Sequence, residues 1–114
     1  MKKLSKIVNL RQPDQIRKVL ASWRMTRFTR TEASAQLITH LWTVADVSLC
    51  EDRRWYWRTS VTSNGENDYS GYAHNLVEAM AAVDKSLESD CLYQYEITGK
   101  ADVISQLLSV ENSR

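Results

Sequence analysis

The chain has 114 residues, of which 43% are apolar and 25% are charged, and its formal net charge is +1. This length suits a single domain over residues 1–114, with a core that needs no disulfide or metal staple. No apolar run approaches the roughly 18 residues of a membrane helix, and the basic N-terminus lacks the apolar block of a signal peptide. With Cys50 and Cys91 as the only cysteines, we expect a cytoplasmic protein that makes no membrane contact.

The small net charge conceals a division along the chain. Residues 1–30 contain nine Lys or Arg and one Asp, a net charge of +8, whereas residues 31–114 contain six basic and thirteen acidic residues, a net charge of −7. Such an asymmetry predicts an anion-seeking N-terminal segment on a mildly acidic body. Attraction between the two halves, within one chain or between copies in a homo-oligomer, is the alternative.

The N-terminal third is predicted to be helical. Residues 1–12 form a basic arm, and Pro13 then suits the first turn of a helix. Ile16, Val19, Leu20 and Trp23 follow the spacing of an amphipathic helix that runs to about Met25.

A second helix is predicted after the capping-box pattern Thr29-Arg30-Thr31-Glu32. Ala33, Leu37, Ile38 and Leu41 would face inward, and the helix would end near Trp42 or Val44. Residues 13–44 are therefore expected to be a helical segment.

The central stretch predicts a three-stranded meander. Val47–Cys50 alternates apolar and polar residues, as a half-buried strand does. In the next strand Trp55 and Trp57 point to one face, while Arg54, Tyr56 and Arg58 point to the other. A tight turn at Asn64-Gly65 would lead into a third strand over residues 68–73.

An amphipathic helix is predicted next, because Asn75 can cap it, Glu78 lies three residues on, and its apolar stripe could cover the Trp55/Trp57 face. Residues 91–97 alternate as a fourth strand that ends at Gly99, and Asp102–Val110 reads as a short last helix. The expected fold is α+β: two N-terminal helices, a small antiparallel sheet of a three-stranded meander plus a fourth strand, a packed amphipathic helix and a short C-terminal helix. Residues 45–99 would hold the sheet and its helix, and residues 100–114 the last helix and tail.

The expected elements partly match two known nucleic-acid-binding topologies. The turn Thr26–Thr29 between two helices has the length found in helix-turn-helix proteins, but no third helix follows directly. The expected order helix, strand, strand, strand, helix over residues 31–88 is that of double-stranded-RNA-binding domains. Those domains carry a lysine cluster at the start of their last helix, where this chain has His74-Asn75-Leu76, so the chain is not assigned to that family.

No catalytic constellation is evident, so we expect a protein that is not an enzyme and uses no cofactor or metal. His40 and His74 lie in different predicted elements, and no glycine-rich phosphate loop or Gly-x-Ser-x-Gly motif occurs. Glu51-Asp52 has arginines beside it and is expected to be a solvated turn.

Two functions remain open. The first is a small accessory protein that binds nucleic acid, or a nucleic-acid-handling complex, through basic residues of the N-terminal segment. Those residues are Lys2, Lys3, Lys6, Arg11, Arg17, Lys18, Arg24, Arg27 and Arg30. The second is a protein-binding inhibitor or adaptor, of a regulatory or mobile-element type such as a phage-encoded inhibitor of a host machine. It would use Arg54, Tyr56 and Arg58, because tyrosine and arginine are enriched in binding hot spots.

Overall fold

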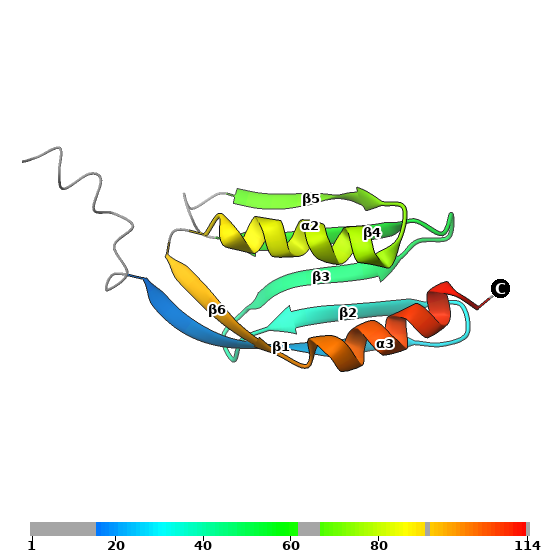
Figure 1. The fold of residues 1–114 in the computed structure, drawn as a ribbon, viewed down its shortest axis with the longest axis horizontal. Coiled ribbons are helices and arrows are strands. Elements are labelled where there is room, and N and C mark those ends of the chain that lie inside the picture. The colour runs from blue at the N-terminus through cyan, green and yellow to red at the C-terminus, as the bar shows by residue number, and fades with distance from the viewer. Residues whose placement is uncertain (1–15, 62–66, 91, 114) are drawn as a thin grey trace, which may run out of the picture.

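In the computed structural model, which describes residues 16–61, 67–90 and 92–113, six strands form one mixed sheet and two helices pack against it (Figure 1). Five strands come first, followed by a helix, a strand and a helix. The elements are β1 (Arg17–Phe28), β2 (Ala33–Ile38), β3 (Thr43–Leu49), β4 (Trp55–Val61), β5 (Asn67–Ala73), α2 (Leu76–Glu88), β6 (Tyr93–Thr98) and α3 (Lys100–Glu111).

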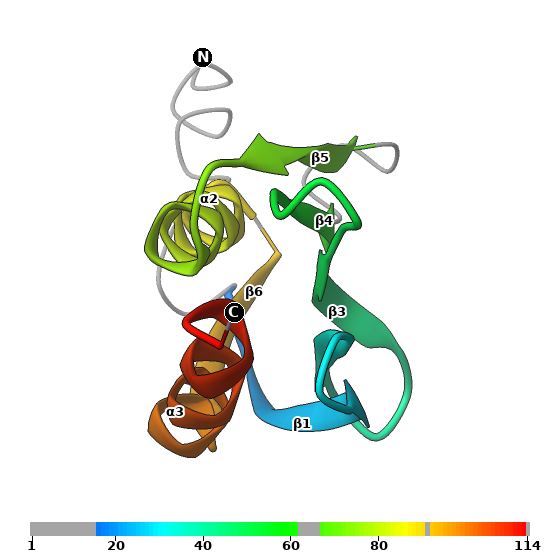
Figure 2. The ribbon, with the colours of Figure 1, turned by 90° about the vertical axis from the view of Figure 1, so that its right-hand side faces the viewer.

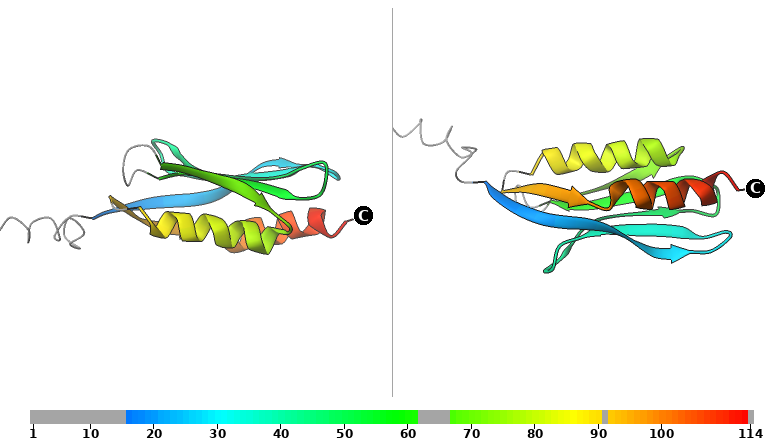
Figure 3. Two further views of the ribbon diagram at one scale, coloured as in Figure 1. Left: turned by 90° about the horizontal axis from the view of Figure 1, so that it is seen from above. Right: turned by 60° about the horizontal axis from the view of Figure 1, so that its bottom comes forward.

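The strand order across the sheet is β5-β4-β3-β2-β1-β6. Strands β1 to β5 form an antiparallel meander, and β6 pairs in parallel with β1 from Arg17 opposite Tyr93 to Ser22 opposite Thr98. The α2 helix therefore carries the chain from one edge of the sheet to the other. Figure 2 shows that the sheet is curved and that α2 and α3 lie on its concave side, and Figure 3 shows both helices on the same side of the strands.

The expectation of a first N-terminal helix is wrong, because residues 17–28 form the long strand β1. Leu20 was expected to face inward with Val19 and Trp23, yet it is 70% exposed while Ala21 and Trp23 are buried. The apolar spacing in this stretch fits both a helix and a strand, and the alternation across the strand decides which side chains are buried.

The expected second helix is also absent from residues 33–44, which form β2, a turn and the start of β3. Ala33, Ala35 and Leu37 are buried in alternation, whereas Leu41, expected inside, is 74% exposed. The Thr29–Glu32 pattern makes a hairpin turn in which Thr29 Oγ1 accepts hydrogen bonds from the backbone N–H groups of Thr31 and Glu32. With no helix before β1 or between β1 and β3 in the described chain, neither the helix-turn-helix nor the double-stranded-RNA-binding topology applies.

Several later elements lie where the sequence placed them. Strands β3, β4 and β5 form the expected meander, although the Asn64-Gly65 turn lies outside the described residues. Asn75 caps α2, with its Oδ1 accepting a hydrogen bond from the backbone N–H of Glu78 at 2.9 Å. The expected small antiparallel sheet is nevertheless wrong, because the real sheet has six strands and its last strand is parallel to the first.

The core lies between the sheet and the helices. Trp55 is fully buried, and α2 packs mainly against β4 while α3 packs mainly against β1. The α2 helix contributes its apolar stripe of Leu76, Ala79, Met80, Val83 and Leu87. Trp57 is partly buried on the same face, and its indole ring lies so close to Gly71 that an added Cβ would sit 3.2 Å from it.

The turn between β3 and β4 is fastened to the end of α3. Arg53 has a positive φ of 74°, and its guanidinium donates to the carbonyl oxygens of Glu111 at 2.9 Å and Val110 at 3.3 Å. The Val110 carbonyl also accepts the backbone N–H of Ser113 at 3.2 Å. The cation adds a donor at the negatively polarised C-terminal end of the helix. Across the described residues, neither helix has the length and apolarity to cross a membrane.

Candidate binding surface

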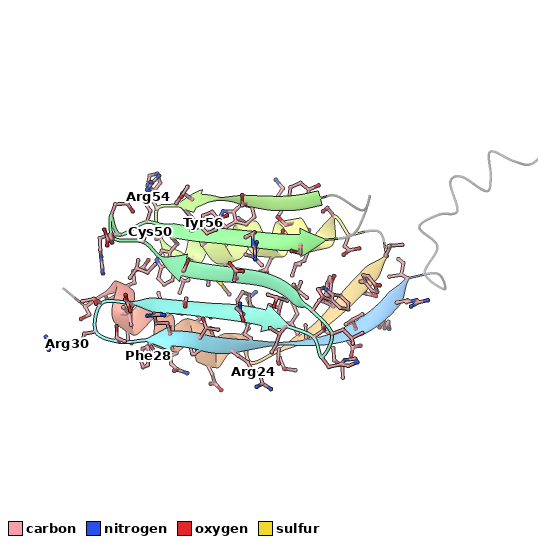
Figure 4. All side chains as sticks on the ribbon, turned by 180° about the vertical axis from the view of Figure 1, so that it is seen from behind. Arg24, Phe28, Arg30, Cys50, Arg54 and Tyr56 are labelled. Carbon is pink, nitrogen blue, oxygen red and sulfur yellow. The ribbon has the colours of Figure 1, made fainter. Side chains whose placement is uncertain are left out.

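Among the described residues, one face of the sheet carries no helix. We call it the open face: the side chains on the side of the strands away from α2 and α3, which Figure 4 views directly. Strand alternation places Arg24, Tyr56 and Arg58 here, because their neighbours Trp23, Trp55 and Thr59 are buried under the helices. The sequence correctly separated Tyr56 and Arg58 from Trp55 and Trp57.

Two adjacent rows of side chains cross this face through paired strands. In the first row Tyr72 pairs with Tyr56, Tyr56 with Ser48, Ser48 with Ser34, and Ser34 with Arg27.

The second row runs Ser70, Arg58, Asp46, Gln36 and Arg24 in the same way. Both rows end at β1 in an arginine, and the middle of the first is built from small hydroxyl side chains. The Tyr56 and Tyr72 side chains are therefore larger than the serine side chains next to them in the first row.

A tyrosine–arginine cluster occupies the β5 end of the first row. The Tyr56 and Tyr72 ring centroids are 5.2 Å apart with the planes tilted by 55°, and the Arg54 guanidinium carbon lies 4.4 Å from the Tyr72 centroid. Such a cation–π contact is worth about 0.5–1 kcal/mol at an exposed site. Arg54 Nε also donates to Asp52 Oδ2 at 2.8 Å.

The carboxylate of Asp52 holds Arg54 in place at both ends. The backbone N–H of Arg54 donates to Asp52 Oδ1 at 3.1 Å, and this bond and the guanidinium bond together lower the pKa of Asp52. Glu51 and Asp52 thus lie in an exposed turn beside their arginines, as the sequence predicted.

The predicted nucleic-acid-binding residues separate into three groups. Lys18, Arg24 and Arg27 lie on the open face of β1. Arg17 alternates to the other side at the start of β1, and Arg30 is in the β1–β2 turn. The remaining four lie outside the described residues: Lys2, Lys3, Lys6 and Arg11.

Ion pairs distinguish the cations of the open face. Arg27 pairs with Glu32 at 3.0 Å, and Arg58 pairs with Asp46 at 3.1 Å. Lys18 and Arg24 have no ion-pair partner among the residues that the structure describes. They are therefore the two open-face cations available without breaking an existing pair.

The charge division along the sequence corresponds in part to a division between the open face of the sheet and the helix layer. Among the described side chains, the open face has five cations: Lys18, Arg24, Arg27, Arg54 and Arg58. Its carboxylates are Asp46 and Glu96, together with Glu32 and Asp52, which pair with Arg27 and Arg54, so the excess is one positive charge. The two helices have five carboxylates and two cations: Glu78, Asp84, Glu88, Asp102 and Glu111 against Lys85 and Lys100. The positive side of the described structure is therefore the side without helices.

The residues considered for chemistry are dispersed. His40 is exposed in the β2–β3 turn, His74 is exposed just before α2, and Cys50 is half-buried in the β3–β4 turn. Cys91 lies outside the described residues. Within the described ranges no group of three or more His, Cys, Asp or Glu side chains could hold a metal ion.

A shallow cavity of about 370 Å³ lies where the β1–β2 turn meets the end of α3. Its lining combines the apolar Phe28 and Val110 with Arg30 and three hydroxyl residues, Thr29, Ser109 and Ser113. It lies at the end of the sheet that holds Phe28 and Arg30 (Figure 4).

Sequence reasoning missed Tyr72 and the serines of the open face. The signal for Tyr72 was the register of β4 and β5, which pairs it with Tyr56. Comparisons of this chain with protein-family models, with curated proteins and with solved structures found no match.

Proposed function

We propose that this protein binds nucleic acid on its open face, as an accessory protein acting alone or within a nucleic-acid-handling complex. The observation that carries the proposal is the position of Lys18 and Arg24 on the open face, where neither has an ion-pair partner among the described residues. Cations that neutralise phosphates release counterions, and this release drives binding that is independent of sequence.

The neighbouring side chains support the same surface. Arg27 and Arg58 extend the positive charge along the two rows, and their side chains are 63% and 49% exposed in their ion pairs. Exposed pairs of this kind contribute little stability, so a phosphate can replace the carboxylate at small cost. Serine hydroxyls between the cations add donors for phosphate oxygens.

The helix layer is the poorer candidate for a phosphate backbone. Its excess of carboxylates would repel the backbone, and Lys100 is already paired with Asp84 at 2.6 Å. A nucleic acid would therefore be steered to the open face.

The test measures salt-dependent binding by fluorescence anisotropy, using a labelled 30-nucleotide single strand and the matching duplex. The double variant Lys18→Gln/Arg24→Gln removes two phosphate contacts, so the slope of log affinity against log salt should fall by about 1.4–1.8. Lys85→Gln is the matched control, because Lys85 is an exposed lysine on α2, on the other side of the molecule. The control should keep the wild-type slope.

Two results would contradict the proposal. One is no binding of wild-type protein to either probe at ~50 mM salt, where phosphate contacts are strongest. The other is equal slopes for the wild type and the double variant, which would place the contacts away from β1.

A protein partner is the second candidate, and the preformed Arg54, Tyr56 and Tyr72 cluster favours it. Rigid aromatic and arginine side chains lose little entropy on binding and are common hot-spot residues. Under this alternative, Tyr56→Ala would lower partner affinity while the double variant at Lys18 and Arg24 would alter mainly the association rate.

A further inference from the structure

We infer that the open face takes single-stranded rather than duplex nucleic acid, with an unpaired base stacked against Tyr72. This inference rests on the proposed function and specifies its substrate class. It depends on the Tyr56, Tyr72 and Arg54 cluster, whereas the proposed function depends on Lys18 and Arg24.

The Tyr72 ring is accessible to a base. Its side chain is 56% exposed, and it lies on β5, the edge strand of the sheet. The Tyr56 and Tyr72 rings are tilted by 55° rather than stacked face to face, and the Arg54 guanidinium lies 4.4 Å from the Tyr72 centroid. A flat aromatic flanked by a guanidinium is the arrangement on which unpaired bases stack.

A nucleic-acid segment whose base stacks on Tyr72 has a polar path across the sheet to the cations of β1. From Tyr72 the first row passes Tyr56, Ser48 and Ser34 before Arg27. Four strand spacings of ~4.8 Å separate β5 from β1, so the path is roughly 19 Å long. Stacking at one end and phosphate contacts at the other can thus act on the same short segment.

Duplex binding does not fit the same surface. Bases inside a duplex are stacked on both faces, so a base would have to leave the helix to reach Tyr72, which costs a few kcal/mol. A helix that enters the major groove is the common way to read a duplex, but α2 and α3 pack on the concave side and carry more carboxylates than cations.

The experiment compares a 12-nucleotide oligothymidine, the same strand with abasic sites at its centre, and a 12-base-pair duplex, each labelled for anisotropy at low salt. Tyr72→Ala should bind the intact strand about tenfold more weakly or worse, and should bind the duplex as the wild type does. Tyr72→Phe keeps the ring and should retain the affinity. Tyr69→Ala is the matched control, because Tyr69 is a 40% exposed tyrosine on β5 that alternates to the opposite face.

The abasic strand provides a second readout. Wild-type protein should bind it as weakly as Tyr72→Ala binds the intact strand, and Tyr72→Ala should lose nothing more when the bases are removed. The salt slope of Tyr72→Ala should equal that of the wild type, since stacking releases no counterions.

The outcomes separate this inference from the proposed function. If Tyr72→Ala binds the intact strand as the wild type does while Lys18→Gln/Arg24→Gln binds weakly, the stacking site is refuted and phosphate binding stands. The stacking site is also refuted if Tyr72→Ala loses as much affinity for the duplex as for the single strand. It is refuted as well if the wild type binds the intact and abasic strands equally, and the cluster would then be assigned to a protein partner. If the wild type binds none of the three probes, the proposed function itself fails.

Discussion

Glu111 and Trp55, 56 residues apart in the chain, meet where the end of α3 reaches the start of β4: Glu111 Oε2 accepts a hydrogen bond from Trp55 Nε1 at 2.7 Å. The same oxygen accepts the backbone N–H of Leu76 at 2.8 Å, which is the first residue of α2. One carboxylate thus satisfies a buried indole and an otherwise unpaired amide at the positive end of a helix.

We predict that Glu111→Ala lowers the free energy of unfolding by about 2–4 kcal/mol, because two buried donors lose their acceptor. Urea denaturation measures the change. Glu88→Ala, at an exposed position on α2, should change stability by less than about 0.5 kcal/mol. A Glu111→Ala midpoint equal to that of Glu88→Ala would mean that the carboxylate does not hold these elements together.

Gly99 is predicted to tolerate no other residue without loss. It joins β6 to α3 with φ of 78°, and an added Cβ would lie 2.9 Å from the backbone oxygen of Trp23. Gly99→Ala should cost about 1–3 kcal/mol. Gly99→Asn relieves the strain of positive φ but not the close contact, so it should also destabilise the protein. An Asn variant as stable as the wild type in thermal melts would show that backbone strain alone selects glycine here.

Replacing each of two buried threonines by valine should change the stability of the protein in opposite directions. Thr59 Oγ1 has no hydrogen-bond partner among the described residues, whereas Thr39 Oγ1 accepts the backbone N–H groups of Leu41 and Trp42. Thr59→Val should therefore stabilise the protein by roughly 1 kcal/mol, and Thr39→Val should destabilise it by a similar amount. Calorimetry on both variants checks the signs, and a loss of stability at both sites would show that the Thr59 hydroxyl is satisfied.

The stability of the protein should fall in alkali partly through Tyr95. Its hydroxyl donates to Asp90 Oδ2 at 3.0 Å, and burial, together with the nearby Asp90 charge, raises the pKa of Tyr95 above its usual value of 10.0. Above pH 10 the unfolded chain releases this proton while the folded protein keeps it, so stability is present below that pH and declines as pH rises. Tyr95→Phe should show a shallower decline between about pH 9.5 and 11.5. Parallel curves for the two proteins would contradict this assignment.

The sequence predicted best the elements that local signals define. The α2 helix has an Asn75 cap and a stripe that fits only a helix, and the alternation through Trp55, Tyr56 and Trp57 defines both faces of β4. It failed at β1, where Ile16, Val19, Leu20 and Trp23 suit a helical stripe equally well. Pairing with β2 and β6 makes this stretch a strand rather than a helix. The β6 partners lie about 75 positions further along the chain, so this pairing leaves no local signal in the sequence of β1.

The candidate surface was predicted in part for the same reason. Tyr56 and Arg58 follow from strand alternation alone, but Tyr72 depends on register. A two-residue turn at Asn64-Gly65, extended outward, would pair Tyr72 with Trp57 on the helix side, whereas the observed register pairs it with Tyr56 on the open face. A shift of one residue exchanges the two faces of a strand.

The most direct test of the open face is nuclear magnetic resonance mapping of the amide signals during titration with a short oligothymidine. The account predicts that the largest shifts belong to residues of the two rows, such as Arg24, Gln36, Tyr56 and Tyr72, while signals of the exposed faces of α2 and α3 stay in place. Shifts confined to α2 and α3, or saturation without any change along β1, β4 and β5, would contradict it.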